Sequence, residues 1–292
     1  MSGRGRLITG TTRVLCILGH PIAHSLSPVM HNRAIEALGL DYVYVAFDVA
    51  PQELGRAVQG LRALGVAGAT VTIPHKEAVL AFVDEMEESV RWTGAANTLV
   101  MRQDGALVAT NTDVDGVRGA LQAAGLRPAG GKAVVLGAGG AARAIVAALV
   151  QEGCRHIVVL NRSPERARRL VEELAPRASP CLLEADALSE QSLRRHLADA
   201  QLLCHATPTG MHPHGDQSPV PRELVRPPLA VLDAVYRPAR TRLLAQALAQ
   251  GCRVASGVDW LVCQGVEAFQ RWTGHRPDPA LLKGALMEVL EP

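Results

Sequence analysis

The stretch KAVVLGAGGAARAIVAALVQEG, residues 132–153, decides the fold of the middle of the chain. It begins as an apolar β-strand, passes through a glycine-rich turn, and continues with apolar residues at helical spacing. Gly137, Gly139 and Ala142 form the pattern G-x-G-x-x-A between the strand and the helix. The first glycine permits a tight turn, the second lets the backbone approach a pyrophosphate, and the alanine keeps the helix close to the sheet with its N-terminus facing the anion. The alternative is a glycine turn that holds no ligand. The residues expected to contact a dinucleotide here are Gly137, Ala138, Gly139, Gly140 and Ala141.

The end of the next strand predicts which dinucleotide is used. The strand IVVL leads into Asn161-Arg162-Ser163, and Arg166 follows in the first turn of the next helix. Proteins that bind NAD usually place a carboxylate here to accept the ribose hydroxyls. Two guanidinium groups and a hydroxyl can instead bind a 2′-phosphate through charge-assisted hydrogen bonds, so the sequence predicts NADP. Ser163, followed by Pro164, also fits a purely structural helix cap, whereas Arg162 has no capping role.

The same alternation of strand and helix extends outward from this stretch. Short β-rich runs alternate with runs of helical period, which is typical of βαβ units on a largely parallel sheet. The tail reads as two amphipathic helices. A chain of 292 residues is long enough for about two domains. We therefore predict an α/β fold with two α/β domains. The runs outside the central stretch are RVLCILG (13–19), PVMHNRAIEALG (28–39), DYVYVAFDV (41–49), PQELGRAVQGLRALG (51–65), GATVTI (68–73), DWLVCQGVEAFQRWTG (259–274) and PALLKGALMEVL (279–290).

Composition and charge exclude several classes of partner. The formal net charge is +2 and no basic stripe is present, which argues against nucleic acid and favours a small-molecule ligand. The apolar run VLCILG is too short for the core of a signal peptide, and no segment reads as a membrane helix, so we expect a cytoplasmic protein that does not bind membranes. Six cysteines lie far apart, without a C-x-x-C pair or a cysteine and histidine cluster, so we expect reduced thiols and no metal.

The loop GHPIAHSLSPVMHN, residues 19–32, suggests a site for a polyol. Alternate residues of an extended segment point the same way, so Ser25 and Ser27 would present two hydroxyls to one side. The alternative is that Ser27 only caps the helix that begins at Pro28.

A second segment, ATVTIPHKEA (69–78), repeats this arrangement with Thr70 and Thr72. A helix is expected to begin at Pro74 and to carry Lys76 in its first turn. The positive end of the helix dipole would disfavour an ammonium group there, which suits a proton-transfer residue. A solvated surface lysine is the alternative, and a nearby carboxylate would oppose the effect of the dipole.

Two further polar residues fall in the same half of the chain. Asn97 in GAANTLV has an amide that can both donate and accept hydrogen bonds. Asp113 in NTDVDG lies where the chain is expected to cross between domains, and it could orient Lys76 or merely cap the helix that follows.

The ordered set of these motifs resembles the shikimate dehydrogenase family. The set comprises S-L-S-P, V-T-I-P-H-K, the N-T of AANTL, N-T-D, G-A-G-G-A, N-R-S-x-x-R-A and LVCQGVEAFQRWTG, and it covers essentially the whole chain. The resemblance implies reversible, NADP-dependent reduction of 3-dehydroshikimate to shikimate, without a metal, by a monomer or homodimer. It implies a substrate domain of residues 1–113 plus 257–292 and an NADP-binding domain of residues 114–256.

The resemblance also implies roles for individual residues. Lys76 and Asp113 look like the catalytic pair. The substrate would be held by Ser25, Ser27, Thr72, Asn97, Tyr236 and Gln264. The cofactor residues would include, besides the glycine turn, Asn161, Arg162, Ser163, Arg166, Thr207 and Gly257.

Two residues depart from the family pattern. Thr70 stands where the family usually has asparagine, and His205 stands where it usually has asparagine before Ala206-Thr207. The loss of an amide at position 70 favours, as the alternative substrates, the related compounds quinate or aminoshikimate. His205 is expected to change how the nicotinamide end of the cofactor is seated. A ligand sensor that has lost catalysis is the alternative from another functional class, and the presence of both Lys76 and Asp113 argues against it.

Overall fold

The computed structural model describes residues 7–291, and these residues form two compact units. One unit runs to Arg91 and also takes in Ala95–Thr112 and Gly265–Val289. The other consists of Trp92–Gly94 and Asp113–Gln264, with Leu290 and Glu291 beyond. Each unit has its own sheet and its own core, and the two are described separately. The two ends of the predicted substrate domain, residues 1–6 and residue 292, lie outside the described part.

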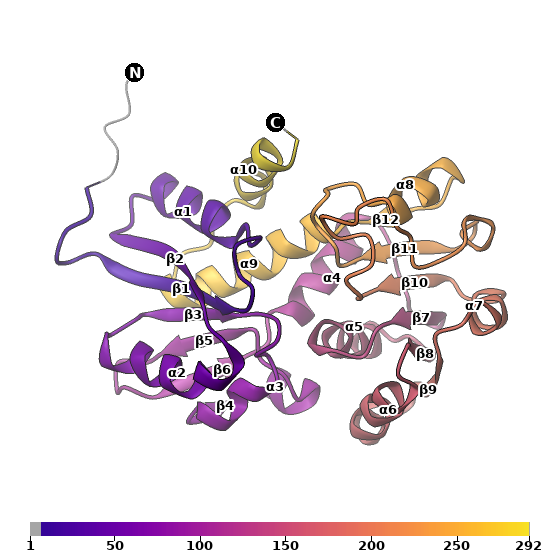
Figure 1. Cartoon of the computed structure of the whole chain (residues 1–292), viewed down its shortest axis with the longest axis horizontal. Coiled ribbons are helices and arrows are strands. Elements are labelled where there is room, and N and C mark those ends of the chain that lie inside the picture. The colour runs from indigo at the N-terminus through magenta and orange to yellow at the C-terminus, as the bar shows by residue number, and fades with distance from the viewer. Residues whose placement is uncertain (1–6, 292) are drawn as a thin grey trace. The chain divides into compact units, whose positions relative to one another are not determined.

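The first unit is built on a mixed sheet. Its strand order is β2-β1-β3-β5-β6-β4 (Figure 1). β1, β2 and β3 are parallel, but β5 runs antiparallel to both β3 and β6. The strands are β1 (Arg13–Gly19), β2 (Tyr42–Asp48), β3 (Gly68–Val71), β4 (Glu85–Met86), β5 (Thr98–Met101) and β6 (Leu107–Thr110).

Helices cover both faces of this sheet because successive strand residues point to opposite sides. On one face, His31 of α1 stacks on Tyr44 of β2 and on Phe269 of α9. On the other face, Val58 of α2 packs with Cys16 and Leu18 of β1. The helices are α1 (Ser27–Ala37), α2 (Leu54–Ala63), α3 (Glu88–Thr93), α9 (Gly257–Thr273) and α10 (Pro279–Leu290), with 3₁₀ turns η1 (Pro51–Glu53) and η2 (Ala78–Phe82). Of α3, only the part to Arg91 belongs to this unit, and of α9 only the part from Gly265.

The helix expected to begin at Pro74 is absent, and that prediction was wrong. A turn closes there instead, because the His75 N–H donates to the Thr72 carbonyl at 2.8 Å. Regular structure resumes only with η2 at Ala78. Lys76 therefore lies in a turn, and the helix-dipole argument does not apply to it.

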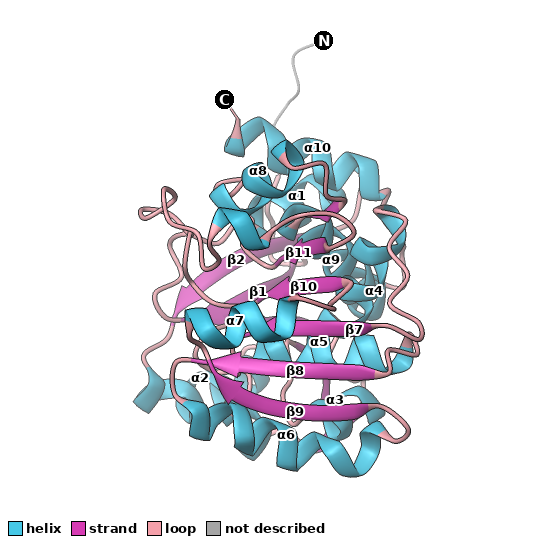
Figure 2. Ribbon diagram, turned by 90° about the vertical axis from the view of Figure 1, so that its right-hand side faces the viewer, coloured by secondary structure: helices cyan, strands magenta, loops and turns pink. Residues whose placement is uncertain are grey.

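The second unit is built on a parallel sheet in the order β12-β11-β10-β7-β8-β9. Figure 2 shows α7 on one face of this sheet and α5 and α6 on the other. Together the two sheets confirm the predicted α/β class. The strands are β7 (Lys132–Leu136), β8 (His156–Asn161), β9 (Leu182–Ala187), β10 (Leu202–His205), β11 (Ala230–Asp233) and β12 (Val254–Ala255). The helices are α4 (Asp113–Ala123), α5 (Gly140–Gln151), α6 (Pro164–Ala178), α7 (Glu190–Leu197) and α8 (Arg242–Ala249), with the 3₁₀ turn η3 (Arg222–Leu224).

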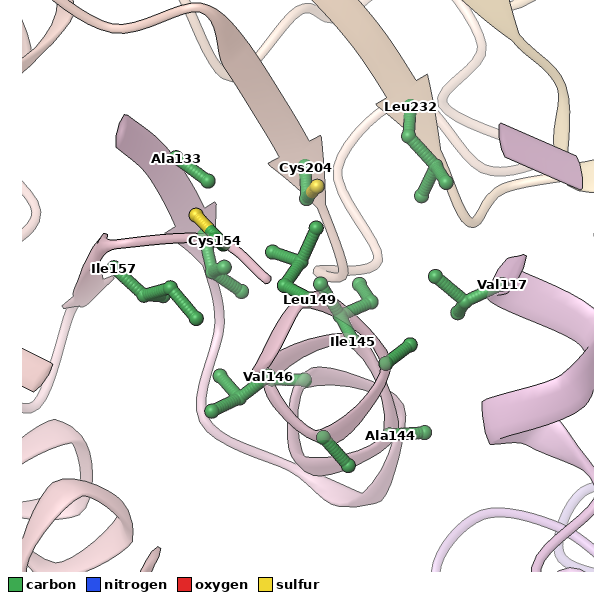
Figure 3. Packing of buried hydrophobic residues seen from close by; sticks show 14 of the residues in the cluster. Val117, Ala133, Ala144, Ile145, Val146, Leu149, Cys154, Ile157, Cys204 and Leu232 are labelled. Atoms are coloured by element: carbon green, nitrogen blue, oxygen red, sulfur yellow. The ribbon is translucent and has the colours of Figure 1, made fainter. Parts of the chain in front are cut away.

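The central stretch quoted above forms the middle of the second unit's core. In Figure 3, Ile145 and Leu149 of α5 point toward Cys204 of β10, while Val117 of α4 approaches from the side. Ala142 is fully buried, which lets the first turn of α5 lie close to the sheet. The helix that follows the glycine turn is therefore packed into the core along most of its length.

The short segment Trp92–Gly94 belongs to the second unit because it is hydrogen-bonded to α5. Arg143 of α5 donates from Nη1 to the Thr93 carbonyl at 3.0 Å and forms an ion pair with Glu173 of α6. Gly94 follows with a φ of 64°, where a Cβ would lie 3.0 Å from Arg143 Nη1. The Trp92–Gly94 segment of the second unit is thereby fixed to α5.

No helix among residues 7–291 is long and apolar enough to cross a membrane. The same residues contain no group of three histidine, cysteine or acidic side chains placed to hold a metal ion. The six cysteines are free, and four of them are buried.

Candidate active site

The carboxyl ends of β1 and β3 bring the two hydroxyl-bearing segments of the first unit together. The Thr72 N–H donates to the Leu18 carbonyl at 2.9 Å, and the His20 N–H donates to the Ile73 carbonyl at 3.0 Å. A Cβ added to Gly19 would lie 2.5 Å from Thr72 Cγ2, so only glycine lets the two segments come this close. The loop that begins at Gly19 and the segment around Thr72 therefore form one surface.

Ser25 and Ser27 lie on this loop in different surroundings. Ser27 is the first residue of α1, whose cap position is Leu26, and no side chain caps the helix. The structural alternative for Ser27 is therefore not observed. The Ser27 N–H donates to Ser25 Oγ at 3.3 Å, and the buried Ser27 side chain lies near the Tyr44 hydroxyl. Ser25 is only partly buried, so its hydroxyl remains accessible to a ligand.

Tyr44 joins the two segments and was missed by the sequence analysis. Its hydroxyl donates to Thr70 Oγ1 at 2.7 Å, and the buried Ser27 side chain lies near the same hydroxyl. Burial raises the pKa of Tyr44 well above its usual range, which keeps the hydroxyl protonated. The signal was present in YVYVAFD, because period-2 alternation places Tyr44 on the inner face of β2.

Asn97 has its orientation fixed by its neighbours. Its Oδ1 accepts hydrogen bonds from the Thr112 N–H at 2.8 Å, from Thr98 Oγ1 at 2.9 Å and from Thr112 Oγ1 at 3.2 Å. An amide nitrogen could not accept these bonds, so the carbonyl faces inward. The sequence predicted an amide that both donates and accepts. In the structure its acceptor oxygen serves the protein.

Lys76 is held beside Asn97 through its backbone. The Lys76 carbonyl accepts the Ala96 N–H at 2.8 Å. The neighbouring His75 is buried, and its Nε2 hydrogen-bonds with the Val49 carbonyl at 2.7 Å. The Lys76 side chain is only partly buried. A fixed backbone with a partly exposed amine suits a group that exchanges a proton with a bound ligand.

The other predicted catalytic and substrate residues belong to the second unit. Asp113 is buried and begins α4. One turn later, a Cβ on Gly116 would lie 2.8 Å from the Cβ of Gln264, so α4 and α9 are in close contact there. Gln264 is buried and donates from Nε2 to the Leu261 carbonyl at 3.0 Å. Tyr236, partly exposed, follows the carboxyl end of β11.

The glycine turn has the geometry that a bound pyrophosphate requires. Gly137 has a φ of 111°, and a Cβ there would lie 2.7 Å from the Ala206 carbonyl oxygen and 3.3 Å from Thr207 Cγ2. A Cβ on Gly139 would meet nothing within 4 Å, so the backbone at the start of α5 is uncovered. Uncovered N–H groups at a helix N-terminus bind anions, and the residues present therefore fit a dinucleotide. Thr207 lies directly beside this turn.

Gly257 lies beside another predicted site residue. A Cβ on Gly257 would lie 2.5 Å from the Val235 carbonyl oxygen and 2.8 Å from that of Ala234. The start of α9 therefore packs against the backbone that leads into Tyr236, and glycine is required for this close approach.

The end of β8 presents the predicted 2′-phosphate site. Arg162, Ser163 and Arg166 are exposed, and within residues 7–291 neither arginine forms an ion pair. Ser163 occupies the cap position of α6, but its side chain makes no capping hydrogen bond. Asn161 shapes the turn by donating from Nδ2 to the Ser163 carbonyl at 3.0 Å. The hydroxyl and the two guanidinium groups therefore remain available to an anion.

Asp186, a carboxylate beside the end of β8, forms hydrogen bonds with α7. Asp186 of β9 pairs in register with Leu160. Arg195 donates to Asp186 Oδ2 at 2.9 Å, and His196 Nε2 lies 3.1 Å from the same oxygen. Burial alone would raise the pKa of Asp186, but the hydrogen bonds from the Ala187 N–H and His196 outweigh it and lower the pKa. Asp186 therefore serves to attach α7 to the sheet.

Comparison with protein families matches three segments of the chain. Residues 17–99 match the shikimate dehydrogenase substrate binding domain, and residues 120–212 match the family described as shikimate / quinate 5-dehydrogenase. Residues 257–287 match the shikimate 5′-dehydrogenase C-terminal domain.

Individual relatives match over nearly the full length. A curated protein of Methanothermobacter thermautotrophicus named shikimate dehydrogenase (NADP(+)) is 45% identical and covers 97% of this chain and 99% of its own. A Thermus thermophilus shikimate 5-dehydrogenase solved with NADP(H) and shikimate has a TM-score of 0.84 and 39% identity, covering 95% of this chain and 100% of its own. Quinate dehydrogenase from Corynebacterium glutamicum, solved with NAD, has a TM-score of 0.87 and 28% identity over 95% of this chain and 99% of its own. The chain belongs to the shikimate dehydrogenase family.

Proposed function

We infer that this protein is an NADP-dependent shikimate dehydrogenase that reversibly reduces the ring ketone of 3-dehydroshikimate to the hydroxyl of shikimate. One observation carries the assignment of its catalytic pair. Asn97 Oδ1 accepts a hydrogen bond from the N–H of Thr112, the residue before Asp113. The neighbouring Ala96 N–H donates to the Lys76 carbonyl. Within the first unit, Lys76 and Thr112 are thus both held by the Ala96–Asn97 stretch, and Asp113 follows Thr112 in the chain.

We propose that Lys76 and Asp113 act as the catalytic pair. When bound, NADPH supplies a hydride to the ketone carbon. Lys76 then holds the proton that neutralises the negative charge developing on the ketone oxygen, and in the reverse direction it receives that proton from the hydroxyl. Asp113 orients the Lys76 amine and accepts a hydrogen bond from a ring hydroxyl.

The remaining polar residues bind and orient the substrate in this proposal. Ser25, Ser27 and Thr72 offer hydroxyls around the carboxyl ends of β1 and β3. Asn97 donates from Nδ2, because its oxygen is occupied by Thr98 and Thr112. Tyr236 and Gln264 complete the set from the second unit. Holding the ring in one orientation supplies much of the rate, because a reaction between two bound partners needs no further search.

For the cofactor, we propose that the glycine turn at Gly137–Ala141 binds the pyrophosphate and that Asn161, Arg162, Ser163 and Arg166 bind the 2′-phosphate. Thr207 and Gly257 would contact the nicotinamide half. The proposal keeps residues 1–113 plus 257–292 as the substrate domain and residues 114–256 as the NADP-binding domain. It also keeps a cytoplasmic monomer or homodimer that binds neither nucleic acid nor membranes.

A second substrate is favoured by one residue. Thr70 replaces the family's usual asparagine, and its hydroxyl is engaged by Tyr44 at 2.7 Å. The surface between Ser27 and Thr72 therefore lacks one amide, and a ring that carries a further hydroxyl or an amine could be tolerated there. Quinate and aminoshikimate are the candidates.

The test is a matrix of initial rates followed at 340 nm. Shikimate, quinate and aminoshikimate are each offered with NADP and with NAD. The proposal expects the highest kcat/KM for shikimate with NADP. A higher value for quinate or aminoshikimate would move the substrate assignment to the alternative, and no reduction with any pair would overturn the enzyme assignment.

A further inference from the structure

His205 lies in a buried hydrogen-bond network at the carboxyl ends of β10 and β11. Its Nδ1 is 2.9 Å from Asp233 Oδ1, and its Nε2 is 2.6 Å from Thr207 Oγ1. His205 and Asp233 are 0% and 1% exposed. The network therefore connects a fully buried carboxylate to the threonine that lies beside the glycine turn.

The Asp233 carboxylate fixes the hydrogen on one side of the imidazole. Asp233 Oδ1 accepts the Val235 N–H at 3.0 Å, and Oδ2 accepts the Thr241 hydroxyl at 2.6 Å. A carboxylate can only accept, so His205 Nδ1 carries a hydrogen and donates it to Asp233. The same carboxylate thereby holds the turn that leads to Tyr236.

The other side of the imidazole determines what Thr207 can offer. A threonine hydroxyl has one hydrogen, and two groups of the protein compete for it: His205 Nε2 at 2.6 Å and Thr209 Oγ1 at 3.2 Å. If the ring is neutral, Thr207 donates to Nε2. If the ring is charged, Nε2 donates to Thr207, whose hydrogen turns to Thr209. In both cases the hydrogen stays within the protein. The Thr209 N–H also donates to Thr207 Oγ1 at 3.3 Å, so a lone pair is left for a ligand when the ring is neutral.

We propose that His205 and Asp233 are positioning residues that make Thr207 a hydrogen-bond acceptor for a donor group of the cofactor. Phosphate oxygens are acceptors, so Thr207 does not bind the pyrophosphate although it lies beside the glycine turn. The donors available on the nicotinamide half are the ribose hydroxyls and the carboxamide N–H groups, which share this chemistry. The inference rests on the proposed cofactor role of Thr207.

The experiment measures equilibrium binding by calorimetry, so it does not depend on turnover. Four ligands separate the candidate groups: NADP, its 3-acetylpyridine analogue, which lacks the carboxamide N–H groups, 2′-phospho-ADP-ribose, which keeps the ribose, and 2′-phospho-ADP, which has neither. Thr207→Val removes the acceptor while keeping the shape of the side chain. A neutral hydrogen bond corresponds to about a 3- to 10-fold change in Kd.

The pattern of losses identifies the donor. If Thr207→Val weakens the binding of NADP but not of the other three ligands, the donor is the carboxamide. If the variant binds NADP, its analogue and 2′-phospho-ADP-ribose more weakly but binds 2′-phospho-ADP normally, the donor is a ribose hydroxyl. Equal weakening of 2′-phospho-ADP would mean a phosphate contact and would overturn the proposal, as would unchanged binding of all four ligands.

A double-mutant cycle tests whether His205 acts through Thr207. His205→Ala is expected to weaken NADP binding about as much as Thr207→Val, and the double variant no more than either. His205→Gln, which keeps a side-chain amide, is expected to restore part of the affinity. Cys204→Ala is the control, because it removes a buried side chain from the same strand without touching this network. Additive losses in the double variant, or equal losses in the control, would leave His205 a purely structural residue. Activity of the wild-type enzyme with shikimate and NADP tests the proposed function independently.

Discussion

The preference for NADP is predicted to reside in Arg162 and Arg166 at the end of β8. Both are exposed, and within residues 7–291 neither forms an ion pair, so both are available for a phosphate. A charge-assisted hydrogen bond contributes about 1.5–3 kcal/mol, and solvent exposure places these at the low end. At about 1.4 kcal/mol per factor of ten, replacing either arginine with alanine should lower kcat/KM for NADP about 10-fold, and replacing both should lower it about 100-fold.

The assay compares initial rates with NADP and NAD at fixed shikimate. Because NAD lacks the 2′-phosphate, kcat/KM for NAD should stay within about threefold of wild type. Arg168→Ala is the matched control, since Arg168 is an exposed arginine of the same helix that pairs with Glu165 at 3.5 Å. Equal losses with both cofactors, or unchanged kinetics with NADP in the double variant, would refute the assignment of these arginines to the phosphate.

Three further predictions concern the first unit. A Cβ on Gly68 would lie 2.2 Å from Trp272 Cδ1, so Gly68→Ala should destabilise the protein by about 1–3 kcal/mol in thermal or denaturant unfolding. Gly60→Ala is the control, because Gly60 lies in a helix and a Cβ there would meet nothing within 4 Å, so this variant should be neutral or stabilising. Equal melting temperatures for the two variants would contradict this prediction. Burial lowers the pKa of His31 from 6.5 to about 3, so between these pH values the unfolded chain binds a proton that the folded chain does not. The free energy of unfolding should therefore fall by about 1.4 kcal/mol per pH unit as the pH drops from about 6.5 toward 3. Urea unfolding at several pH values should show this slope in the wild type and a flatter one in His31→Phe, and equal slopes would show that His31 is not the group responsible. Asn97→Asp keeps the oxygen that the protein uses but loses the amide hydrogens, so kcat/KM for shikimate should fall at least about 10-fold, and unimpaired kinetics would exclude Asn97 as a donor to the substrate.

The sequence predicted the parts of the fold that local patterns determine. The glycine turn, the helices at both ends and the parallel strands of the second unit follow from strong periodicity and from the φ of 111° that only glycine adopts easily at Gly137. β5 was missed because Thr98–Met101 is too short to carry a period, and its antiparallel pairing with β3 depends on distant residues. The helix at Pro74 was predicted wrongly because a proline after a strand fits a turn as well as a helix start.

The candidate site was predicted unevenly for a similar reason. Residues within short motifs, such as Lys76 and Asn97, could be selected from the sequence. The buried partners of Thr70 and His205 could not be selected, because they come from distant strands: Tyr44 contacts Thr70 from β2, and Asp233 contacts His205 from β11. The sequence identified His205 as a departure from the family pattern, but its charged partner became visible only in the folded chain.

The central claim is that the amine of Lys76 exchanges the proton while the cofactor exchanges the hydride. It is tested most directly by Lys76→Ala, with Lys132→Ala as the control because Lys132 pairs with Asp199 in the second unit. For Lys76→Ala the account predicts a kcat for shikimate oxidation at least about 100-fold below wild type, with the Kd for NADP within about twofold. A kcat close to that of wild type would contradict the account.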